Sequence, residues 1–317
     1  MASYTDWKTA PTFVNSLIEK GMAMSFNNPQ KGVFESYTKV ITSGSNQNTL
    51  LALGGLPEMA EWSGAKVFDG LRLLLQNVQN KNWSANLKLH KDTLRYDQSG
   101  LVGDAVSGLL AAQLDFYAKQ AITAMIANGT CITGVALFSA SQPYANAGGG
   151  GTQSNYGTTT MSLAIIDTII ETMRAYTFEG KLLNIVPDYL VCGPHKERMA
   201  KEICETPDRT VAVANDGVEA GTRIGVTTVM KAFPGGKLTV IIDPRLAGTY
   251  DEYFFIGDSK VSKPMAAITA EAPHMVAQDR DDSYFRFLNN EYLWSVEANV
   301  AFAPYFPFGC YGSFVTT

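Results

Sequence analysis

The sequence contains few charged residues. Lys, Arg, Asp and Glu make up 17% of its 317 residues, whereas roughly 25% is usual in soluble globular proteins. A subunit that hides much of its surface in permanent contacts with other subunits needs fewer charges. An ordinary globular enzyme of low charge would give the same composition, so composition leaves both interpretations open.

Several targeting and binding signals are also missing. No run of Lys or Arg exceeds two residues and the net charge is −5, so the sequence lacks the footprint of a dedicated nucleic-acid binder. The N-terminus has no positively charged start followed by an apolar core and a cleavage site. No apolar run reaches the roughly 18 residues of a transmembrane helix. We therefore expect a soluble protein that is made in the cytoplasm and has no membrane partner.

Cysteine is rare and dispersed. The four cysteines form no C-x-x-C pair, and we expect them to be reduced, buried apolar residues: Cys131, Cys192, Cys204 and Cys310. Cys192 and His195 are close enough in the sequence to suggest a thiol nucleophile with its base. Gly193-Pro194 separates them at the end of an expected strand, so a structural role for Cys192 is the favoured interpretation.

Phosphate and metal sites lack their usual residue patterns. The four glycines Gly148–Gly151 are not followed by the Gly-Lys-Ser/Thr ending of a phosphate-binding loop. The acidic residues Asp279, Asp281 and Asp282 could hold a divalent cation, but they lack the spacing of a calcium loop, which favours a solvated turn. The three histidines are too well separated to indicate a zinc site: His90, His195 and His274. We therefore expect no cofactor, no metal and no catalytic residue.

A strand is predicted from Trp83 to His90, where apolar and polar side chains alternate as in a half-exposed strand. Val67–Leu75 is its expected partner, and the Asn- and Gln-rich segment Asn77–Asn82 is the expected turn. A hairpin of two strands is marginal in isolation. Its apolar face is therefore predicted to need a second surface, such as a neighbouring subunit.

Two segments have helical periodicity. Over residues 103–128 apolar side chains fall at helical spacing, and Asn128-Gly129 provides a left-handed stop. At 1.5 Å per residue this helix would be about 39 Å long, enough for a rigid spine. A second amphipathic helix is predicted over 161–176, whereas residues 139–158 have no periodicity and predict a mobile loop.

The remaining sequence predicts a short helix over 195–204 and then short strands separated by turn residues, among them the segments LTVIID and YFFIGD. Strands and helices do not alternate regularly as βαβ units. The fold class is therefore α+β, without the pattern of a doubly wound sheet.

Five segments, in this order, resemble the major head subunit family of Mu-like phages. They are Leu56-Pro57-Glu58-Met59 with Glu61-Trp62-Ser63-Gly64; Asn80-Lys81-x-Trp83 with Lys91, Leu94, Asp97 and Gly100; Gly134-x-x-Leu137-Phe138 with Ser154-Asn155; Pro187-x-x-Leu190-Val191-x-x-Pro194 with Glu197 and Ala200; and the aromatic, glycine-bearing C-terminal strand. The match covers roughly residues 50–205, and its strength lies in the order and spacing of the motifs. A histidine that is frequent in the family's loop motif is replaced by Gln142.

The resemblance implies the HK97 capsid fold. Its expected parts are an N-terminal arm over 1–60, an extended E-loop hairpin over 61–98, a peripheral domain over 99–160 with the spine helix 103–128, an axial domain with return strands over 161–300, and a C-terminal strand over 301–317. The axial tips of such subunits meet at fivefold and sixfold axes. Rings of this kind need head-to-tail contacts between unlike surfaces.

The expected function is that of a major capsid protein, which self-assembles into the icosahedral or prolate head shell of a tailed bacteriophage around double-stranded DNA. The expected partners are further copies of the chain in hexamers and pentamers, a separate scaffold, a maturation protease, a portal, and packaged DNA in weak non-specific contact. The predicted location is the virion. The predicted inter-subunit residues lie on and around the hairpin: Trp62, Lys81, Trp83, Leu87, Leu89, Lys91 and Asp97.

The sequence leaves one alternative function and one possible modification to consider. A soluble α+β enzyme, a hydrolase, is the alternative function, and it requires paired acids or the Cys/His pair to converge in a pocket. Some HK97-fold capsids join their subunits by Lys to Asn isopeptide bonds. Lys81, Lys88 and Lys91 lie on the expected hairpin, but no Asn and Glu partner is identifiable, so we expect solvated lysines.

Overall fold

The computed structural model of the protein describes eleven parts of the chain: residues 14–16, 34–54, 72–95, 101–144, 151–178, 181–205, 208–211, 224–227, 238–260, 263–280 and 284–315.

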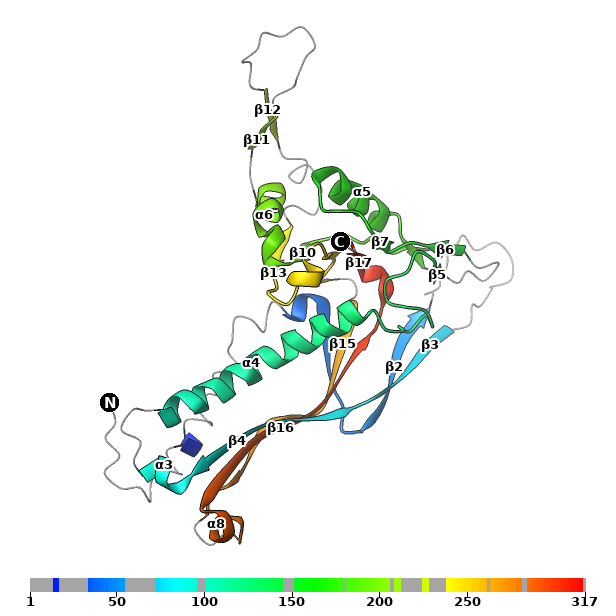
Figure 1. Cartoon of the computed structure of the whole chain (residues 1–317). Coiled ribbons are helices and arrows are strands. Elements are labelled where there is room, and N and C mark those ends of the chain that lie inside the picture. The colour runs from blue at the N-terminus through cyan, green and yellow to red at the C-terminus, as the bar shows by residue number, and fades with distance from the viewer. Residues whose placement is uncertain are drawn as a thin grey trace.

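A long four-stranded sheet forms one half of the molecule (Figure 1). Its strand order is β1-β15-β16-β4, with β1 parallel to β15 and the other pairs antiparallel. The strands are β1 (Thr38–Thr42), β4 (Lys81–His90), β15 (Met265–Gln278) and β16 (Glu291–Pro304). The short helix α8 (Tyr284–Asn289) lies between β15 and β16 in the chain, at the far end of this sheet.

Helix α4 (Leu101–Ala127) runs along one face of the long sheet (Figure 1). Its 27 residues span about 40 Å, and they confirm the helix predicted over 103–128. Asn128 ends the helix at a φ of +49°, a left-handed conformation that Asn tolerates. The Asn128 side chain accepts a hydrogen bond from the backbone N–H of Phe138 (2.7 Å) and donates one to its carbonyl oxygen (3.0 Å). The short helix α3 (Lys91–Arg95) connects β4 toward α4.

A compact five-stranded sheet forms the other half, in the order β13-β10-β14-β17-β7. Its strands are β7 (Tyr156–Gly157), β10 (Tyr189–Cys192), β13 (Thr239–Ile242), β14 (Phe254–Gly257) and β17 (Cys310–Ser313). Two helices, α5 (Leu163–Arg174) and α6 (Glu197–Glu205), belong to this half, together with the 3₁₀ turn η2 (Pro194–Lys196). They confirm the helices predicted over 161–176 and 195–204.

The compact sheet is covered on both faces, because alternate residues of β10 and β14 enter different cores. Leu190 and Phe254 join the core that contains Ile166 and Ile169 of α5. Their neighbours in sequence join a second core with the C-terminal half of α4, whose members there are Ala118, Ala121, Ile122 and Met125. Helix α4 therefore packs against both sheets and links the two halves.

The remaining described elements are short. They are β2 (Gln47–Gly54) with β3 (Arg72–Gln79), β5 (Gln142–Tyr144) with β6 (Gly151–Gln153), β8 (Thr177–Phe178) with β9 (Lys181–Leu182), β11 (Asp208–Val211) with β12 (Ile224–Thr227), and the 3₁₀ turns η3 (Gly248–Tyr250) and η4 (Pro307–Gly309). The β11–β12 ribbon extends away from the compact half, beyond α6 (Figure 1).

The hairpin pairing predicted from the sequence is wrong. Strand β3 pairs with β2, and β4 pairs with β16, so the described part of the predicted partner Val67–Leu75, residues 72–75, does not pair with the strand that begins near Trp83. Residues 67–71 lie outside the described residues. The amide-rich segment before β4 does not reverse the chain. Asn77 is a strand residue that accepts a hydrogen bond from the Thr49 hydroxyl (2.9 Å), and Asn80 alone separates β3 from β4.

Three further expectations are corrected in part. The loop predicted over 139–158 contains β5, β6 and β7, while 145–150, with most of the four-glycine run, lie outside the described residues. The arm predicted over 1–60 contains β1 and β2, which are paired strands. The expected boundary between residues 300 and 301 falls inside β16. In each case the segment forms strands that pair with other parts of the chain, and the local sequence does not specify the partner.

Candidate inter-subunit surfaces

The β2–β3 hairpin has one buried face and one exposed apolar face. Leu50 and Val78 are buried in the core shared with α5, and the Tyr305 hydroxyl donates a hydrogen bond to the carbonyl oxygen of Leu51 (2.7 Å). On the opposite face Leu51 and Leu75 are direct cross-strand partners, with 55% and 62% of their surface exposed. The hairpin is thus anchored on one side and presents an apolar pair on the other.

The predicted inter-subunit face of β4 is largely covered within the chain. Trp83 and Leu87 are half-buried and Leu89 is buried. The Trp83 indole packs edge-on against Phe116 of α4, with ring centroids 5.1 Å apart, and its Nε1 donates to the carbonyl oxygen of Val300 (2.9 Å). The chain's own elements already bury Leu89, so its contact with a neighbouring subunit stays a prediction.

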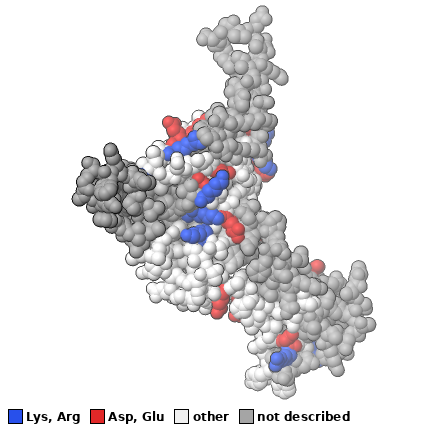
Figure 2. All heavy atoms as spheres, turned by 180° about the vertical axis from the view of Figure 1, so that it is seen from behind, with Lys and Arg blue, Asp and Glu red and all other residues white. Residues whose placement is uncertain are grey.

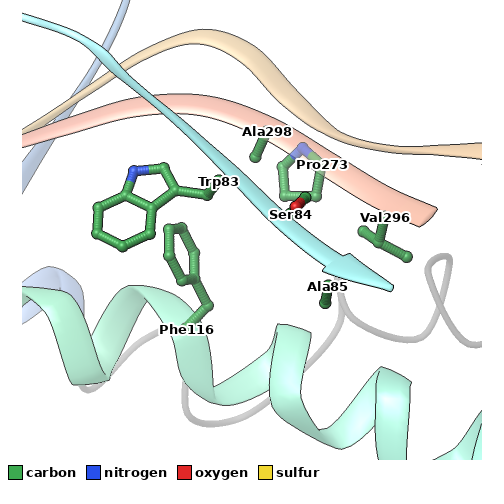
Figure 3. Close-up of a pocket in the computed structure, with 7 residues that line it drawn as sticks. All are labelled: Trp83, Ser84, Ala85, Phe116, Pro273, Val296 and Ala298. Carbon is green, nitrogen blue, oxygen red and sulfur yellow. The ribbon is translucent and has the colours of Figure 1, made fainter. Parts of the chain in front are cut away.

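A shallow apolar pocket remains between α4 and the long sheet beside this contact (Figure 3). Its volume is about 100 Å³, and its lining comes from β4, α4, β15 and β16: Trp83, Ser84, Ala85, Phe116, Pro273, Val296 and Ala298. Figure 3 shows the rings of Trp83 and Phe116 side by side at one end of the pocket. The lining holds no ionisable group, so the pocket offers no acid, base or metal ligand.

The other predicted inter-subunit residues are scattered. Lys81 is exposed on β4, and Lys91 is half-buried at the start of α3. Lys88, one of the three lysines on the expected hairpin, pairs with Glu291 of the neighbouring strand (Nζ to Oε1, 3.0 Å). Two residues, Trp62 and Asp97, lie outside the described residues.

A short N-terminal segment, residues 14–16, packs against the long sheet. Val14 is fully buried, and Asn15 accepts a hydrogen bond from Trp294 Nε1 (2.9 Å) while donating one to Asp279 Oδ2 (2.6 Å). The acidic cluster considered as a cation site thus gives one carboxylate to a structural hydrogen bond. Its other two members, Asp281 and Asp282, lie outside the described residues.

Helix α8 carries an exposed apolar patch that sequence reasoning missed. Tyr284, Phe287 and Leu288 are 77%, 83% and 58% exposed at the far end of the β15–β16 pair. Exposed apolar residues that gather at one place are typical of interaction surfaces. The signal in the sequence was the segment YFRFLN directly after an acidic turn, where helical spacing places these three residues on one side.

Charged groups are few on the described part of the face drawn in Figure 2. Figure 2, which views the molecule from behind, shows acidic and basic residues in a few small groups separated by wide areas without charge. The described residues contain no group of three or more His, Cys, Asp or Glu that could hold a metal ion. In the same described residues no helix is long and apolar enough to cross a membrane.

The thiol and imidazole considered as a catalytic pair do not form one. Cys192 is fully buried, and burial raises the pKa of its thiol to about 12, with a further rise from the nearby Glu197. His195 is exposed, and its Nε2 lies 3.9 Å from Glu252 Oε1. A buried thiol of such high pKa is a poor nucleophile, which supports the structural interpretation of Cys192.

Two buried amides hold the segment between α4 and α5. The side chain of Asn155 donates to the carbonyl oxygens of Leu137 (2.8 Å) and Pro307 (2.9 Å) and accepts from the N–H of Ser139 (2.8 Å). Gln142 is likewise fully buried and donates to the carbonyl oxygen of Leu137 (3.0 Å). The residues quoted from the loop motif therefore act in packing this segment against the C-terminal strand.

The compact half, the long sheet and the helix between them match known capsid folds. Among solved structures the mature capsid of bacteriophage PhiM1 matches with a TM-score of 0.52 at 13% identity, over 90% of this chain and 87% of that chain. A structure from Mycobacterium phage Adephagia gives 0.52 at 12% identity, over 90% of each chain. Structural neighbours of this kind have the HK97-like fold.

A capsid chain of bacteriophage JBD30, decorated with minor capsid protein trimers, matches 88% of this chain with a TM-score of 0.47 at 12% identity. The chain spans 63% of the length of that JBD30 chain. No curated protein matches this chain. A family model described as "Phage capsid protein" matches residues 81–312, which is most of the chain. The chain therefore belongs to the phage capsid protein family, and it is a structural protein of the phage head shell with an HK97-like fold and not an enzyme.

Proposed function

We propose that this chain is the major head subunit of a tailed phage of the Mu-like type, and that it self-assembles in the host cytoplasm into the rings of five and six copies that make up the shell. The observation that carries the proposal is the apolar pair Leu51 and Leu75, which a well-anchored hairpin exposes. The Mu-like assignment is supported by the order and spacing of the motifs over roughly residues 50–205.

We assign the parts of the fold by their position in the structure. The E-loop corresponds to residues 47–79, bounded by β2 and β3; the peripheral domain contains the long sheet and α4; and the axial domain contains the compact sheet. This places the E-loop earlier in the chain than the segment 61–98. The β11–β12 ribbon, which extends beyond α6, is the proposed axial contact at the centre of a ring.

The E-loop is suited to a head-to-tail contact. In such a ring each subunit offers one surface and receives a different one from its neighbour. The exposed leucine pair supplies apolar area, at about 25 cal/mol per Å² removed from water, without requiring charges. The exposed Lys81 and the half-buried Trp83, Leu87 and Lys91 lie on the adjoining β4 and α3, and we propose them as secondary contacts.

The remaining partners follow from the shell function. A separate scaffold, a maturation protease and a portal are proposed, together with weak non-specific contact with packaged double-stranded DNA. The low proportion of charged residues in the sequence, 17%, is consistent with a shell that encloses DNA without gripping it.

The test is assembly of the purified full chain. Sedimentation velocity combined with negative-stain electron microscopy should reveal rings or closed shells, with or without a co-expressed scaffold. A chain that remains monomeric at high concentration, both alone and beside the scaffold, would overturn the proposal. Denaturing electrophoresis of the particles should give a single monomer band, because no covalent cross-link is proposed.

A further inference from the structure

One side chain joins the two halves of the molecule by ion pairs. Arg245 follows β13 of the compact sheet, and its Nη1 lies 2.8 Å from Asp243 Oδ2 while its Nη2 contacts Asp115 Oδ1 of α4. The backbone N–H of Arg245 also donates to Asp243 Oδ1 (2.9 Å). The guanidinium therefore links a carboxylate of the compact half to a carboxylate of the long helix.

The loop that presents Arg245 is fixed in place. Asp243 donates its backbone N–H to the carbonyl oxygen of Cys192 (3.0 Å), and Leu246 is fully buried. The carbonyl oxygen of Leu246 approaches Gly193 so closely that a Cβ at Gly193 would lie 1.7 Å from it. The position of the Arg245 backbone is thus set by the compact sheet, with little freedom to follow α4.

Asp115 immediately precedes the part of α4 that packs on the compact sheet. Among the α4 side chains that the structure describes, Tyr117 and Ala118 are the first to contact the core shared with that sheet. Phe116, the residue directly after Asp115, packs instead against Trp83 and Phe302 of the long sheet. Two adjacent residues therefore hold the helix to two different sheets.

The ion pairs are poorly explained as a stability device. Burial raises the pKa of Asp243 above its ordinary value even though Arg245 lies beside it, so removal from water outweighs the attraction. A buried ion pair such as Arg245–Asp243 often gives no net stability, and a pair with a half-exposed carboxylate such as Asp115 contributes little. A planar guanidinium that contacts two carboxylates does, however, fix direction and distance, whereas apolar packing is non-directional and permits sliding of packed helices.

We propose that the Asp115–Arg245–Asp243 triad sets the angle between α4 with its long sheet and the compact sheet, and thereby the curvature of the assembled shell. The proposal rests on the proposed function, because curvature has meaning only for a chain that builds shells. Asp115 and Arg245 are positioning residues in this role. They restrict the relative movement of the two halves that apolar packing alone would allow.

Asp115→Asn is the informative substitution. The Asp115 side chain is 51% exposed, so its replacement should leave folding intact while it removes the charge that holds Arg245 to the helix. Asp115→Glu keeps the charge and serves as the rescue variant. Asp104→Asn removes a carboxylate from an exposed position nearer the start of the same helix and serves as the matched control.

The measurement is the diameter distribution of shells by electron microscopy, together with the melting temperature of each full-length variant. Asp115→Asn should broaden or shift the diameters, or arrest assembly at free rings, with an unchanged melting temperature; Asp115→Glu and Asp104→Asn should resemble wild type. Wild-type diameters for Asp115→Asn overturn the proposal, as does an equal shift for Asp104→Asn.

Failure of the proposed function would look different, because the wild-type chain itself would then form no shells. In that case small-angle X-ray scattering of the unassembled chain still tests the triad. Asp115→Asn should widen the distribution of distances within the molecule relative to wild type. Identical scattering profiles for the two proteins overturn the proposal.

Discussion

Leu51 and Leu75 stand directly opposite each other in the β2–β3 ladder, and each exposes more than half of its surface to solvent. Directly opposed residues on one face of an antiparallel pair have their Cβ atoms about 5 Å apart, so the two side chains form one continuous apolar patch. Their sequence neighbours Leu50 and Leu74 point to the opposite face and pack on the core. One hairpin therefore combines an anchoring face with a face available to another subunit.

Substituting this patch should separate assembly from folding. Leu51→Ser and Leu75→Ser should each change the free energy of unfolding by no more than about 0.5 kcal/mol, because exposed side chains contribute little. Shell formation should nevertheless fail or require a higher protein concentration, as followed by light scattering. Leu50→Ala is the matched control: it should destabilise the subunit by about 2–5 kcal/mol through cavity formation. Normal assembly of the double variant Leu51→Ser/Leu75→Ser would contradict the assigned role of the patch.

Local periodicity predicted the helices well, because an amphipathic pattern fixes which face of a helix is buried. It predicted α4 and α5, and it recognised β4 as half-exposed. It could not identify what covers β4, since Phe116 lies more than thirty residues away in the sequence and Asn15 contacts Trp294 across most of the chain. Strand partners and inter-helix contacts depend on tertiary packing, which alternation alone does not specify.

The hairpin error has a specific cause. Amide side chains favour turns because they can bond to nearby backbone groups, but Asn77 and Asn80 bond instead to groups on and before β2. The inter-subunit residues predicted from the sequence therefore lie mostly on β4, whereas the contact that we propose lies one strand earlier, on β2 and β3. The exposed Leu51 and Leu75 were missed, although each lies in an apolar segment that the sequence displays.

Substitution of Trp83 should lower the stability of the single subunit, because the contacts of its side chain lie within the chain. Trp83→Phe removes the hydrogen bond to the carbonyl oxygen of Val300 and should cost about 1 kcal/mol. Trp83→Ala also removes the contact with Phe116 and, since the side chain is half-buried, should cost about 2–3 kcal/mol. Urea unfolding of the unassembled subunit measures both values. Ser84→Ala, on the exposed face of the same strand, should change little. A Trp83→Ala subunit as stable as wild type would assign the indole to a neighbouring subunit instead.

The loss of stability caused by Arg245→Met should depend on pH. It leaves the buried Asp243 carboxylate without its cation, which should cost about 3–5 kcal/mol at neutral pH, and it removes an influence that lowers the pKa of Asp243. A carboxyl whose pKa is higher in the folded than in the unfolded state binds its proton more tightly when folded. Stability is then highest below the unfolded pKa of about 3.9 and falls as pH rises through the folded pKa.

The difference in unfolding free energy between Arg245→Met and wild type should therefore shrink as the pH is lowered from 7 toward 4.5. Thermal unfolding across this range measures it. Asp243→Asn combined with Arg245→Met is the control, because it removes the carboxyl and should abolish this part of the pH dependence. A difference that stays constant with pH would show that Asp243 is not the group responsible.

Asn155 should be intolerant of substitution despite its polarity. Its fully buried amide donates to three carbonyl oxygens and accepts from one N–H, and each buried group left without a partner costs about 1–3 kcal/mol. Asn155→Ala should therefore cost about 3 kcal/mol or more by urea unfolding. Asn155→Asp, which replaces a donor with an acceptor that faces carbonyl oxygens, should be similarly harmful although it conserves shape. Asn86→Ala, at an exposed position on β4, should be nearly neutral.

The thiols should be inert in the folded protein. All four cysteines are buried, and burial raises the pKa of both Cys192 and Cys310 to about 12. At pH 8 only about one such thiol in ten thousand would be ionised, and the thiolate is the reactive form. Labelling with a chromogenic disulfide reagent should detect all four thiols in denaturant and far less than one per native chain over the same time. Rapid native labelling of one thiol, lost in Cys192→Ser, would instead point to an activated cysteine. That outcome would contradict the structural role assigned to Cys192. The thiol is buried, and His195, which lies near Glu252, does not serve as its base.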